Sequence, residues 1–599
     1  MEIKQQFKTI PMYDPDSDRF MVKEEQWPGC EPIEVIYRKG NGGYTKEEME
    51  QKIMSGEQVS PFSYCPELNT HTYEAAPGIL CDRDTPVKMR DGVTIYADIF
   101  RPADSGPVPL IISWGPFGKN MMEGNGKFQP VGVPPKTVSP MAKFESADPG
   151  YWVPNGYAVA NVDPRGVGNS EGLVSNWGVQ DHYDGYDFIE WAAEQEWCNG
   201  KVSMFGNSGV CMVIWGIAST RPPHLACIGA WEGTGDMYRE SFTMGGMMAP
   251  GYNNNMVNSI ASKTWVEDAP NMLAAHPYFD EYWKAHAPKW ERINVPAYIC
   301  SGLCHIHNRG SWEAFRKIRS PKKWFRAHRD MEWPDTYNRD NLDDLKKFYD
   351  RYLKDIHNGW ETTPRVRLDI MDAFDYDYQP KRPEKEIPLA RTIYKKLYLD
   401  ASSHKLSYDP YPTHTEVSYD PKTETTCFDI KFEEDTEITG YISAHLNIEC
   451  RGHDDMDLFL WVKKLGQRGE YVPVYCAGVP YRGAWAYFRG QRRELDPELS
   501  TPYDPVQAHQ KDEPMEPGRI YPVDIEFYPT CRIWHKGETL RLEIQGRFIQ
   551  TEWFEDSHFI FEGENGDGIH VIHTGGEYQS WLQIPYIPPK YESGDYVYR

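Results

Sequence analysis

Ser208 is the residue whose surroundings most clearly suggest chemistry. It follows the apolar run Val202–Phe205 and the pair Gly206-Asn207, and a second apolar run begins directly after it. This order predicts a strand, a tight turn and a helix, which would hold the hydroxyl beside the free N–H groups of the helix. The pattern is nearly Gly-x-Ser-x-Gly, with Val210 at the last position. A serine that only caps the helix would look similar, so the motif alone leaves both interpretations open.

A parallel sheet is predicted to position Ser208. Short apolar runs alternate with helical patterns, and these runs are Leu110–Ile112, Tyr157–Val162, Val202–Phe205, Cys227–Trp231, Ala297–Cys300 and Trp324–Ala327. Buried runs of this length between helices are typical of a sheet covered on both faces. The active site of such a sheet lies at the carboxyl ends of its strands. Asp91-Gly92, between two alternating runs, predicts a hairpin before the sheet.

The pattern along the chain predicts four regions. Residues 1–80 are polar and form an N-terminal extension, and residues 81–235 and 296–365 form the α/β core. Residues 236–295 contain no strand-like run, which predicts a helical cap inserted into the core. Residues 366–599 alternate in polarity between turns, as in an all-β sandwich.

Charge and composition exclude several classes of protein. The 599 residues carry a net charge of −25, so nucleic acids and anionic membranes are not expected partners. The chain starts with no apolar signal core and contains no run long enough to span a membrane. Its 12 scattered cysteines suit a reducing compartment. We expect a cytoplasmic protein with a small-molecule substrate. The protein could act as a monomer or as a homodimer.

Several motifs together resemble the cocaine-esterase and X-Pro dipeptidyl-peptidase group of α/β-hydrolases. They are Asp91-Gly92-Val93, the string Asp163–Gly172 and Gly206-Asn207-Ser208. Asp454–Asp457 is similar to a signature in the group's C-terminal domain. The resemblance covers roughly residues 81–550 and implies an α/β-hydrolase core, a helical cap and a C-terminal jelly roll. It also implies a serine esterase or amidase, or an acyltransferase, that forms an acyl-enzyme on Ser208 with water or another nucleophile as the acceptor.

The resemblance assigns some catalytic roles and leaves others unfilled. Members of the group use Ser, Asp and His, with a Tyr hydroxyl in the oxyanion hole. Ser208 matches the nucleophile and Gly209 the helix-start amide that binds the oxyanion. The tyrosine falls within Trp114–Lys119, where this chain has Phe117, which cannot donate a hydrogen bond. The acid is expected after Ala297–Cys300, but no carboxylate follows, and His305 lies near that position.

The base is expected after the run Trp324–Ala327. His328 comes a few residues early, and Met331 or Glu332 falls nearer the usual place. We prefer His328 as the base, oriented by Glu232 or by Glu332, because neighbouring strand ends can present an acid to one imidazole.

An exchanged arrangement is also possible, since a triad is recognised by its geometry and not by its order in the chain. In that case His305 or His307 would be the base, and Glu332 or Asp330 the acid. If the triad is degenerate, the fold would instead serve a lyase, a cyclase or a binding protein in specialised metabolism.

The sequence predicts an apolar or aromatic ester or amide as the substrate, because the strand ends and the cap are rich in Trp and Met. No cofactor is expected, since Gly166-x-Gly168 lacks the rest of a dinucleotide fingerprint. No metal is expected either. A zinc site on Cys300, Cys304, His305 and His307 is disfavoured because this spacing matches no ordinary zinc motif.

Overall fold

The computed structural model describes residues 9–12, 19–27, 29–40, 42–57, 59, 63–120, 128, 131–481, 483–548 and 567–589. The chain divides into two compact units. The first, here the α/β unit, comprises residues 1–241, 250–325 and 330–363. The second, here the β unit, comprises residues 242–249, 326–329 and 364–599. The long stretch of the β unit therefore starts next to the predicted boundary at residue 366.

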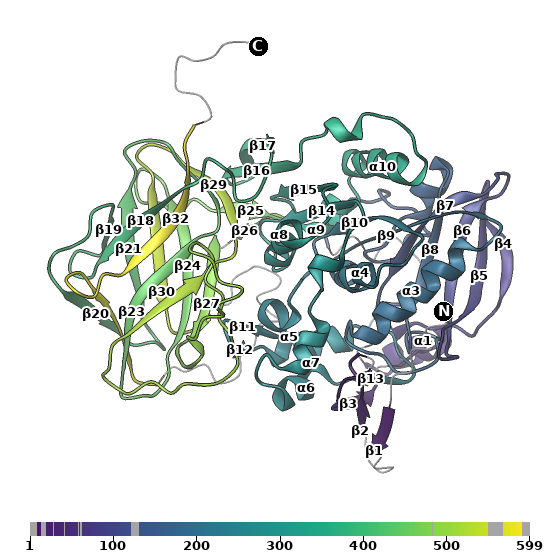
Figure 1. The fold of residues 1–599 in the computed structure, drawn as a ribbon, viewed down its shortest axis with the longest axis horizontal. Coiled ribbons are helices and arrows are strands. Elements are labelled where there is room, and N and C mark those ends of the chain that lie inside the picture. Colours follow the sequence, from purple (N-terminus) through teal and green to yellow (C-terminus); the bar gives the residue numbers. More distant parts are fainter. Residues whose placement is uncertain are drawn as a thin grey trace, which may run out of the picture. The chain divides into compact units, whose positions relative to one another are not determined.

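A mixed sheet forms the centre of the α/β unit (Figure 1). Its strands lie in the order β4 (His71–Ala76), β5 (Ile79–Lys88), β6 (Thr94–Pro102), β8 (Ala158–Asp163), β7 (Val108–Trp114), β9 (Cys198–Asn207), β10 (Leu225–Trp231) and β14 (Ala297–Gly302). β15 (Lys323–His328) follows β14. From β8 to β14 the pairs are parallel, whereas β4, β5 and β6 pair antiparallel. Both the parallel sheet and the hairpin at Asp91-Gly92 are confirmed.

Helices cover both faces of this sheet (Figure 1). α3 (Val179–Ala193) and α4 (Ser208–Thr220) pack against each other and against β9. On the opposite face, α2 (Pro149–Trp152) and α10 (Arg339–Leu353) enclose an aromatic core. That core includes Trp152, Phe205, Trp231, Trp324, Phe348 and Trp360, all with at most 1% of their surface exposed. The helices α8 (Asn308–Lys317) and α9 (Glu332–Thr336) follow β14 and β15.

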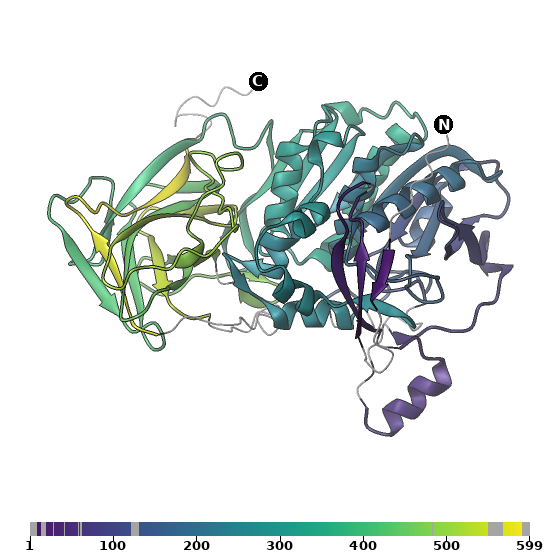
Figure 2. The same ribbon diagram turned by 60° about the horizontal axis from the view of Figure 1, so that its bottom comes forward.

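The N-terminal extension and the predicted cap share a sheet. β1 (Thr9–Met12), β2 (Arg19–Glu24) and β3 (Ile33–Lys39) pair in sequence, and β3 also pairs with β13 (Trp265–Glu267). The region 236–295 also contains α5 (Pro250–Asn258), α6 (Ala269–Ala275), α7 (Glu281–His286) and the short pair β11 (Thr243–Met244) and β12 (Met247–Met248). The prediction that this region lacks strands is therefore wrong. Figure 2 shows β1–β3 side by side and α1 (Lys46–Met54) projecting from the α/β unit.

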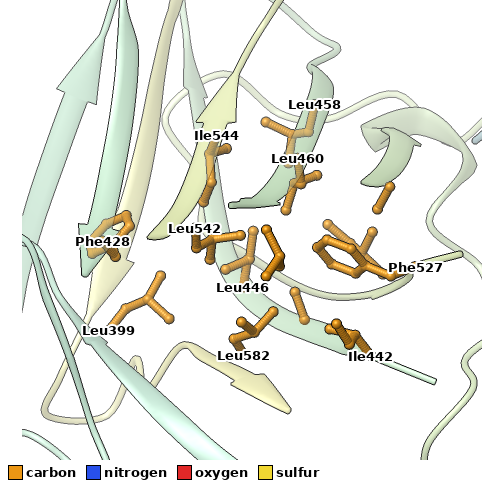
Figure 3. Packing of buried hydrophobic residues seen from close by; sticks show 14 of the residues in the cluster. Leu399, Phe428, Ile442, Leu446, Leu458, Leu460, Phe527, Leu542, Ile544 and Leu582 are labelled. Carbon is orange, nitrogen blue, oxygen red and sulfur yellow. The ribbon is translucent and has the colours of Figure 1, made fainter. Parts of the chain in front are cut away.

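The β unit is built from strands that pair mostly antiparallel. They are β16 (Val366–Ala373), β17 (Tyr376–Glu384), β18 (Ile393–Asp400), β19 (Lys405–Ser407), β20 (Thr415–Tyr419), β21 (Thr425–Lys431), β22 (Thr436–Gly440), β23 (Ser443–Arg451), β24 (Asp457–Leu465), β25 (Val474–Cys476), β26 (Val479–Tyr481), β27 (Ala484–Arg489), β28 (Tyr521–Glu526), β29 (Thr530–Trp534), β30 (Thr539–Gln545), β31 (Ile569–Thr574) and β32 (Trp581–Ile587). Alternate residues such as Leu458 and Leu460, or Leu542 and Ile544, fill one core (Figure 3). This arrangement fits the expected jelly roll.

All 12 cysteines are free thiols. Within the described ranges, we find no helix with both the length and the apolar character needed to cross a lipid bilayer.

The turn between β9 and α4 explains the valine at position 210. A Cβ atom built on Gly206 would lie 2.2 Å from Cγ1 of Val210, and one built on Gly115 would lie 2.6 Å from its Cγ2. Val210 therefore fills the space that two glycines leave, one in its own turn and one directly after β7. The small residue that the usual motif places at position 210 is provided here by Gly115.

We predict that Gly115→Ala destabilises the protein and that Val210→Ala rescues it. The added methyl group would overlap Cγ2 of Val210, and overpacking of this kind costs about 1–3 kcal/mol. In the double variant the nearest remaining atom is Cβ of Val210, at 3.6 Å, an ordinary contact distance. Urea unfolding of the wild type, both single variants and the double variant measures the coupling. Additive losses in the double variant would contradict this account of the turn.

Candidate active site

Ser208 has the backbone conformation of a nucleophile at a strand–helix turn. β9 ends at Asn207, α4 begins at Ser208, and the φ angle of Ser208 is 51°, in the left-handed region. The Ser208 N–H donates a hydrogen bond of 3.0 Å to the main-chain carbonyl of Glu232, just after β10. A non-glycine residue in this conformation is uncommon, and the nucleophile of a strand–turn–helix motif sits on such a sharp, strained turn. The predicted strand, turn and helix are confirmed.

His307 lies beside the Ser208 hydroxyl. Its Nε2 atom is 3.0 Å from Ser208 Oγ, and its Nδ1 atom is 2.7 Å from Thr234 Oγ1. Thr234 Oγ1 in turn lies 3.2 Å from Ser241 Oγ. If Nδ1–H donates to Thr234, the lone pair of Nε2 faces Ser208 and can accept its proton. Burial, and to a lesser degree the neighbouring ring of His305, lowers the pKa of His307 well below its usual range, so the imidazole is neutral at pH 7.

A buried histidine–carboxylate hydrogen bond positions the main chain of His307. His305 Nε2 lies 3.2 Å from Glu332 Oε1, and His305 Nδ1 accepts a hydrogen bond of 3.4 Å from the His307 N–H. Asn207 Nδ2 donates to the other oxygen of Glu332 over 3.1 Å. The rings of His305 and His307 lie 4.6 Å apart between centroids. The carboxylate of Glu332 thus reaches the base indirectly, through His305.

A second buried carboxyl, Glu145, lies at the first turn of α4. Its Oε2 atom accepts a long hydrogen bond of 3.4 Å from the Val210 N–H, and the Ser208 side chain is also a hydrogen-bond partner. Its Oε1 atom accepts from the Trp333 indole N–H over 3.1 Å. Burial, followed by the charge of Glu332, raises the pKa of Glu145 well above its usual range, which favours a neutral carboxyl. A neutral carboxyl donates one hydrogen bond.

Aromatic rings form a wall beside Gly209. A Cβ atom built on Gly209 would lie 2.9 Å from Cζ of Phe117 and 3.4 Å from Oε2 of Glu145. Phe117 packs edge-on against Phe144 with centroids 5.3 Å apart, and Phe144 lies 5.7 Å from Trp333. Phe117 therefore presents an apolar surface beside Gly209, the residue whose N–H is expected to bind the oxyanion.

Several of the predicted site residues meet around Ser208. Gly209 and Phe117 flank the serine on one side, and His305 and Glu332 form the buried pair described above. The imidazole at hydrogen-bond distance from Ser208 Oγ is that of His307, which belongs to the exchanged arrangement. The geometry thus favours that arrangement over our preference for His328.

The remaining predicted residues have other surroundings. His328 ends β15 and is buried, with 2% of its surface exposed. Glu232 provides its main-chain carbonyl to Ser208, while its carboxylate points towards Gly302. Trp114 ends β7 and packs against Phe188 of α3 at a centroid distance of 5.9 Å, within the layer between sheet and helix.

Sequence reasoning missed Thr234 and Glu145. Thr234 follows the predicted strand Cys227–Trp231, so its place at a carboxyl strand end was a signal that could have found it. Glu145 lies in the long connection between β7 and β8, where no pattern in the sequence marks it.

His305, His307 and Glu332 also form a group that could hold a metal ion, since one ligand atom from each lies within 4.8 Å of the others. If a cation were bound through His307 Nε2, it would take the lone pair that faces Ser208, and this nitrogen could no longer accept the serine proton.

Comparisons with known proteins agree with this architecture. Residues 91–258 match the model of the X-Pro dipeptidyl-peptidase (S15) family, and residues 358–583 match the X-Pro dipeptidyl-peptidase C-terminal non-catalytic domain. The chain is 25% identical to a cocaine esterase from Rhodococcus sp. (strain MB1 Bresler), over 84% of this chain and 97% of that protein.

Solved structures extend the similarity to the whole fold. A CocE/NonD family hydrolase from Staphylococcus aureus is 33% identical, with a TM-score of 0.80 over 85% of this chain and 94% of that one. An aminopeptidase from a marine sediment archaeon (Thaumarchaeota archaeon) has a TM-score of 0.63 over 87% of this chain and 99% of that one. At 16% identity, this second likeness shows the fold alone. The chain is therefore a serine hydrolase with an α/β-hydrolase fold and belongs to the CocE/NonD family, within the cocaine-esterase and X-Pro dipeptidyl-peptidase group.

Proposed function

We propose that this enzyme hydrolyses an ester or amide with a small apolar or aromatic acyl group, through an acyl-enzyme on Ser208. The observation that carries the proposal is the 3.0 Å contact between Ser208 Oγ and His307 Nε2, at a serine held in the left-handed conformation. A neutral, buried imidazole at this distance has the geometry of a general base.

The proposed reaction has two steps. Ser208 Oγ attacks the carbonyl carbon as its proton passes to His307 Nε2, and the bond to the leaving group breaks as His307 returns that proton to it. In the second step, water attacks the acyl-enzyme as its proton passes to His307 Nε2. The bond to Ser208 Oγ then breaks as His307 returns this proton to Oγ, so that the acid is released and the free serine is restored. The Gly209 N–H, in the first turn of α4, stabilises the oxyanion in both steps.

Thr234 takes the place of the triad carboxylate in this scheme. Its hydroxyl oxygen, 2.7 Å from His307 Nδ1, holds the tautomer whose Nε2 can accept a proton. A hydroxyl does not neutralise the imidazolium that forms during the reaction. We assign that role to Glu332, whose carboxylate is hydrogen-bonded to His305, the ring packed against His307.

Glu145 supplies the second oxyanion donor in place of the tyrosine hydroxyl. The Trp333 indole N–H donates to Oε1 over 3.1 Å, whereas the Val210 N–H donates to Oε2 over a longer 3.4 Å. We therefore place the proton of the neutral carboxyl on Oε2, which faces the start of α4. A buried carboxylic acid kept neutral at pH 7 performs this role in ketosteroid isomerase. Phe117 and Phe144 provide an apolar surface next to the same site, which supports an apolar or aromatic acyl group.

The nucleophile and the base are tested with a fluorophosphonate probe. The wild type should gain one adduct by intact mass and Ser208→Ala none, whereas His307→Gln should react about 10²–10⁴-fold more slowly because the general base is lost. His224→Gln is a matched control, since His224 pairs with Glu190 at 2.8 Å, in a different part of the α/β unit, and should label like the wild type. Labelling of Ser208→Ala, or unchanged labelling of His307→Gln, would refute the proposal.

Thr234 is tested with Thr234→Val and Thr234→Ser, which differ in the hydroxyl that faces His307. We expect Thr234→Ser to keep kcat/KM for an aryl ester within a few-fold, because it keeps the hydroxyl. Thr234→Val should lower kcat at least tenfold, up to the ~10⁴-fold loss seen when a triad partner cannot hold the tautomer. Equal rates in the two variants would remove Thr234 from the mechanism.

Glu145 is tested with Glu145→Gln and Glu145→Leu. The amide keeps a donor, so Glu145→Gln should stay active, whereas Glu145→Leu should lose about 10²–10³ in kcat, the usual cost of one oxyanion donor. In the wild type, activity should fall as pH rises through the raised pKa of Glu145, because the carboxylate cannot donate and repels the oxyanion. Glu145→Gln should lack that decline. Equal activity of both variants, with the alkaline decline retained, would contradict this role.

A further inference from the structure

We propose that the β unit binds one divalent metal ion of the zinc class through His414, Glu416 and His573. One ligand atom from each of these side chains lies within 4.8 Å of the other two. The site uses no residue of the Ser208 site and does not depend on the proposed hydrolase mechanism. It also goes beyond the expectation from the sequence, which predicted no metal.

Strand pairing brings the three side chains together across 159 residues of sequence. β20 pairs antiparallel with β31, and Glu416 lies directly opposite His573 in this register. Side chains of directly opposed residues share one face of the sheet. His414 comes immediately before β20, so the cluster joins the start of one strand to the end of its neighbour.

The distances between the ligand atoms suit a tetrahedral ion. His414 Nε2 lies 3.0 Å from His573 Nδ1, and Glu416 Oε2 lies 3.5 Å from the same nitrogen. Ligands bound at about 2.0–2.1 Å on a tetrahedron are roughly 3.3 Å apart, so little rearrangement is needed. His414 and Glu416 are exposed, which leaves a fourth position for water.

The outer hydrogen bonds prepare His573 to act as a ligand. Its Nε2 atom lies 2.7 Å from Glu449 Oε2, so the ring proton belongs on Nε2 and the lone pair of Nδ1 faces His414 and Glu416. Arg451 donates to Glu449 over 2.7 Å and to Glu416 over 3.0 Å. A metal-bound histidine whose other nitrogen donates to a carboxylate is a common arrangement in zinc sites.

Charge and ligand type favour zinc over harder cations. The carboxylates of Glu416 and Glu449 and the guanidinium of Arg451 together leave a single net negative charge beside the two imidazole rings. Imidazole nitrogen suits Zn²⁺ and its transition-metal neighbours, whereas Mg²⁺ and Ca²⁺ prefer all-oxygen sites. A bound ion would join the segment before β20 to β31 and thereby stabilise the β unit.

The test measures Zn²⁺ binding to the full-length protein without a polyhistidine tag, after dialysis against a chelator. We expect calorimetry with ZnCl₂ to give one equivalent bound, with a rise in Tm. Glu449→Gln should weaken binding about 10–100-fold, as expected for an outer-shell partner. His414→Ala and Glu416→Gln should each weaken it further. Because His414 and Glu416 are exposed, we expect both variants to fold like the wild type, and circular dichroism tests this.

His445→Asn is the matched control, because His445 pairs with Asp524 at 2.8 Å and stacks on Trp581, outside the cluster. It should bind Zn²⁺ like the wild type. The proposal is overturned if the wild type binds less than one equivalent, or if His414→Ala and Glu416→Gln retain wild-type affinity, which would place the bound ion elsewhere.

Discussion

The left-handed backbone of Ser208 is the constraint on which the site depends. A strained residue of this kind costs about 1–3 kcal/mol and persists only where its surroundings hold it. Here the Ser208 N–H bonds the carbonyl of Glu232, and the Glu232 N–H bonds the carbonyl of Cys300 over 2.9 Å. Glu232 is itself left-handed, with a φ angle of 54°. Main-chain hydrogen bonds thus connect the ends of β9, β10 and β14, and Ser208 lies at this edge of the sheet.

The electrostatics of the site follow from burial. Glu145, His307 and Glu332 all lie away from solvent, where charged forms are disfavoured unless they are paired. Burial raises the pKa of Glu332, but His305 and Asn207 favour its charged form. Burial and the charge of Glu332 both raise the pKa of Glu145 and favour its neutral form. One carboxyl is therefore suited to carry charge and the other to stay neutral. Such a division between neighbouring acids is how one site holds a proton donor and a charge stabiliser together.

Three departures from the family pattern have a local compensation. Val210 replaces a small residue, and Gly115 leaves the space that its side chain needs. Phe117 removes a donor, and Glu145 lies at the same end of α4. No carboxylate follows β14, and Thr234 contacts the imidazole of His307 instead. In each case the compensating residue comes from a different segment of the chain.

The sequence alone determined the parallel sheet, the strand–turn–helix at Ser208 and the all-β second half, because hydrophobic periodicity and glycine-rich turns are local signals. It also placed Ser208 and the candidate histidines at the carboxyl ends of strands. It did not determine which histidine faces Ser208, since His305 and His307 follow β14 and His328 ends β15 of the same sheet. Only the tertiary structure decided between them, because a hydrogen bond depends on distances of a few tenths of an ångström that chain order does not specify. The same holds for Glu145 and for the pairing of Glu416 with His573, whose partners are distant in sequence and meet only when the chain is folded.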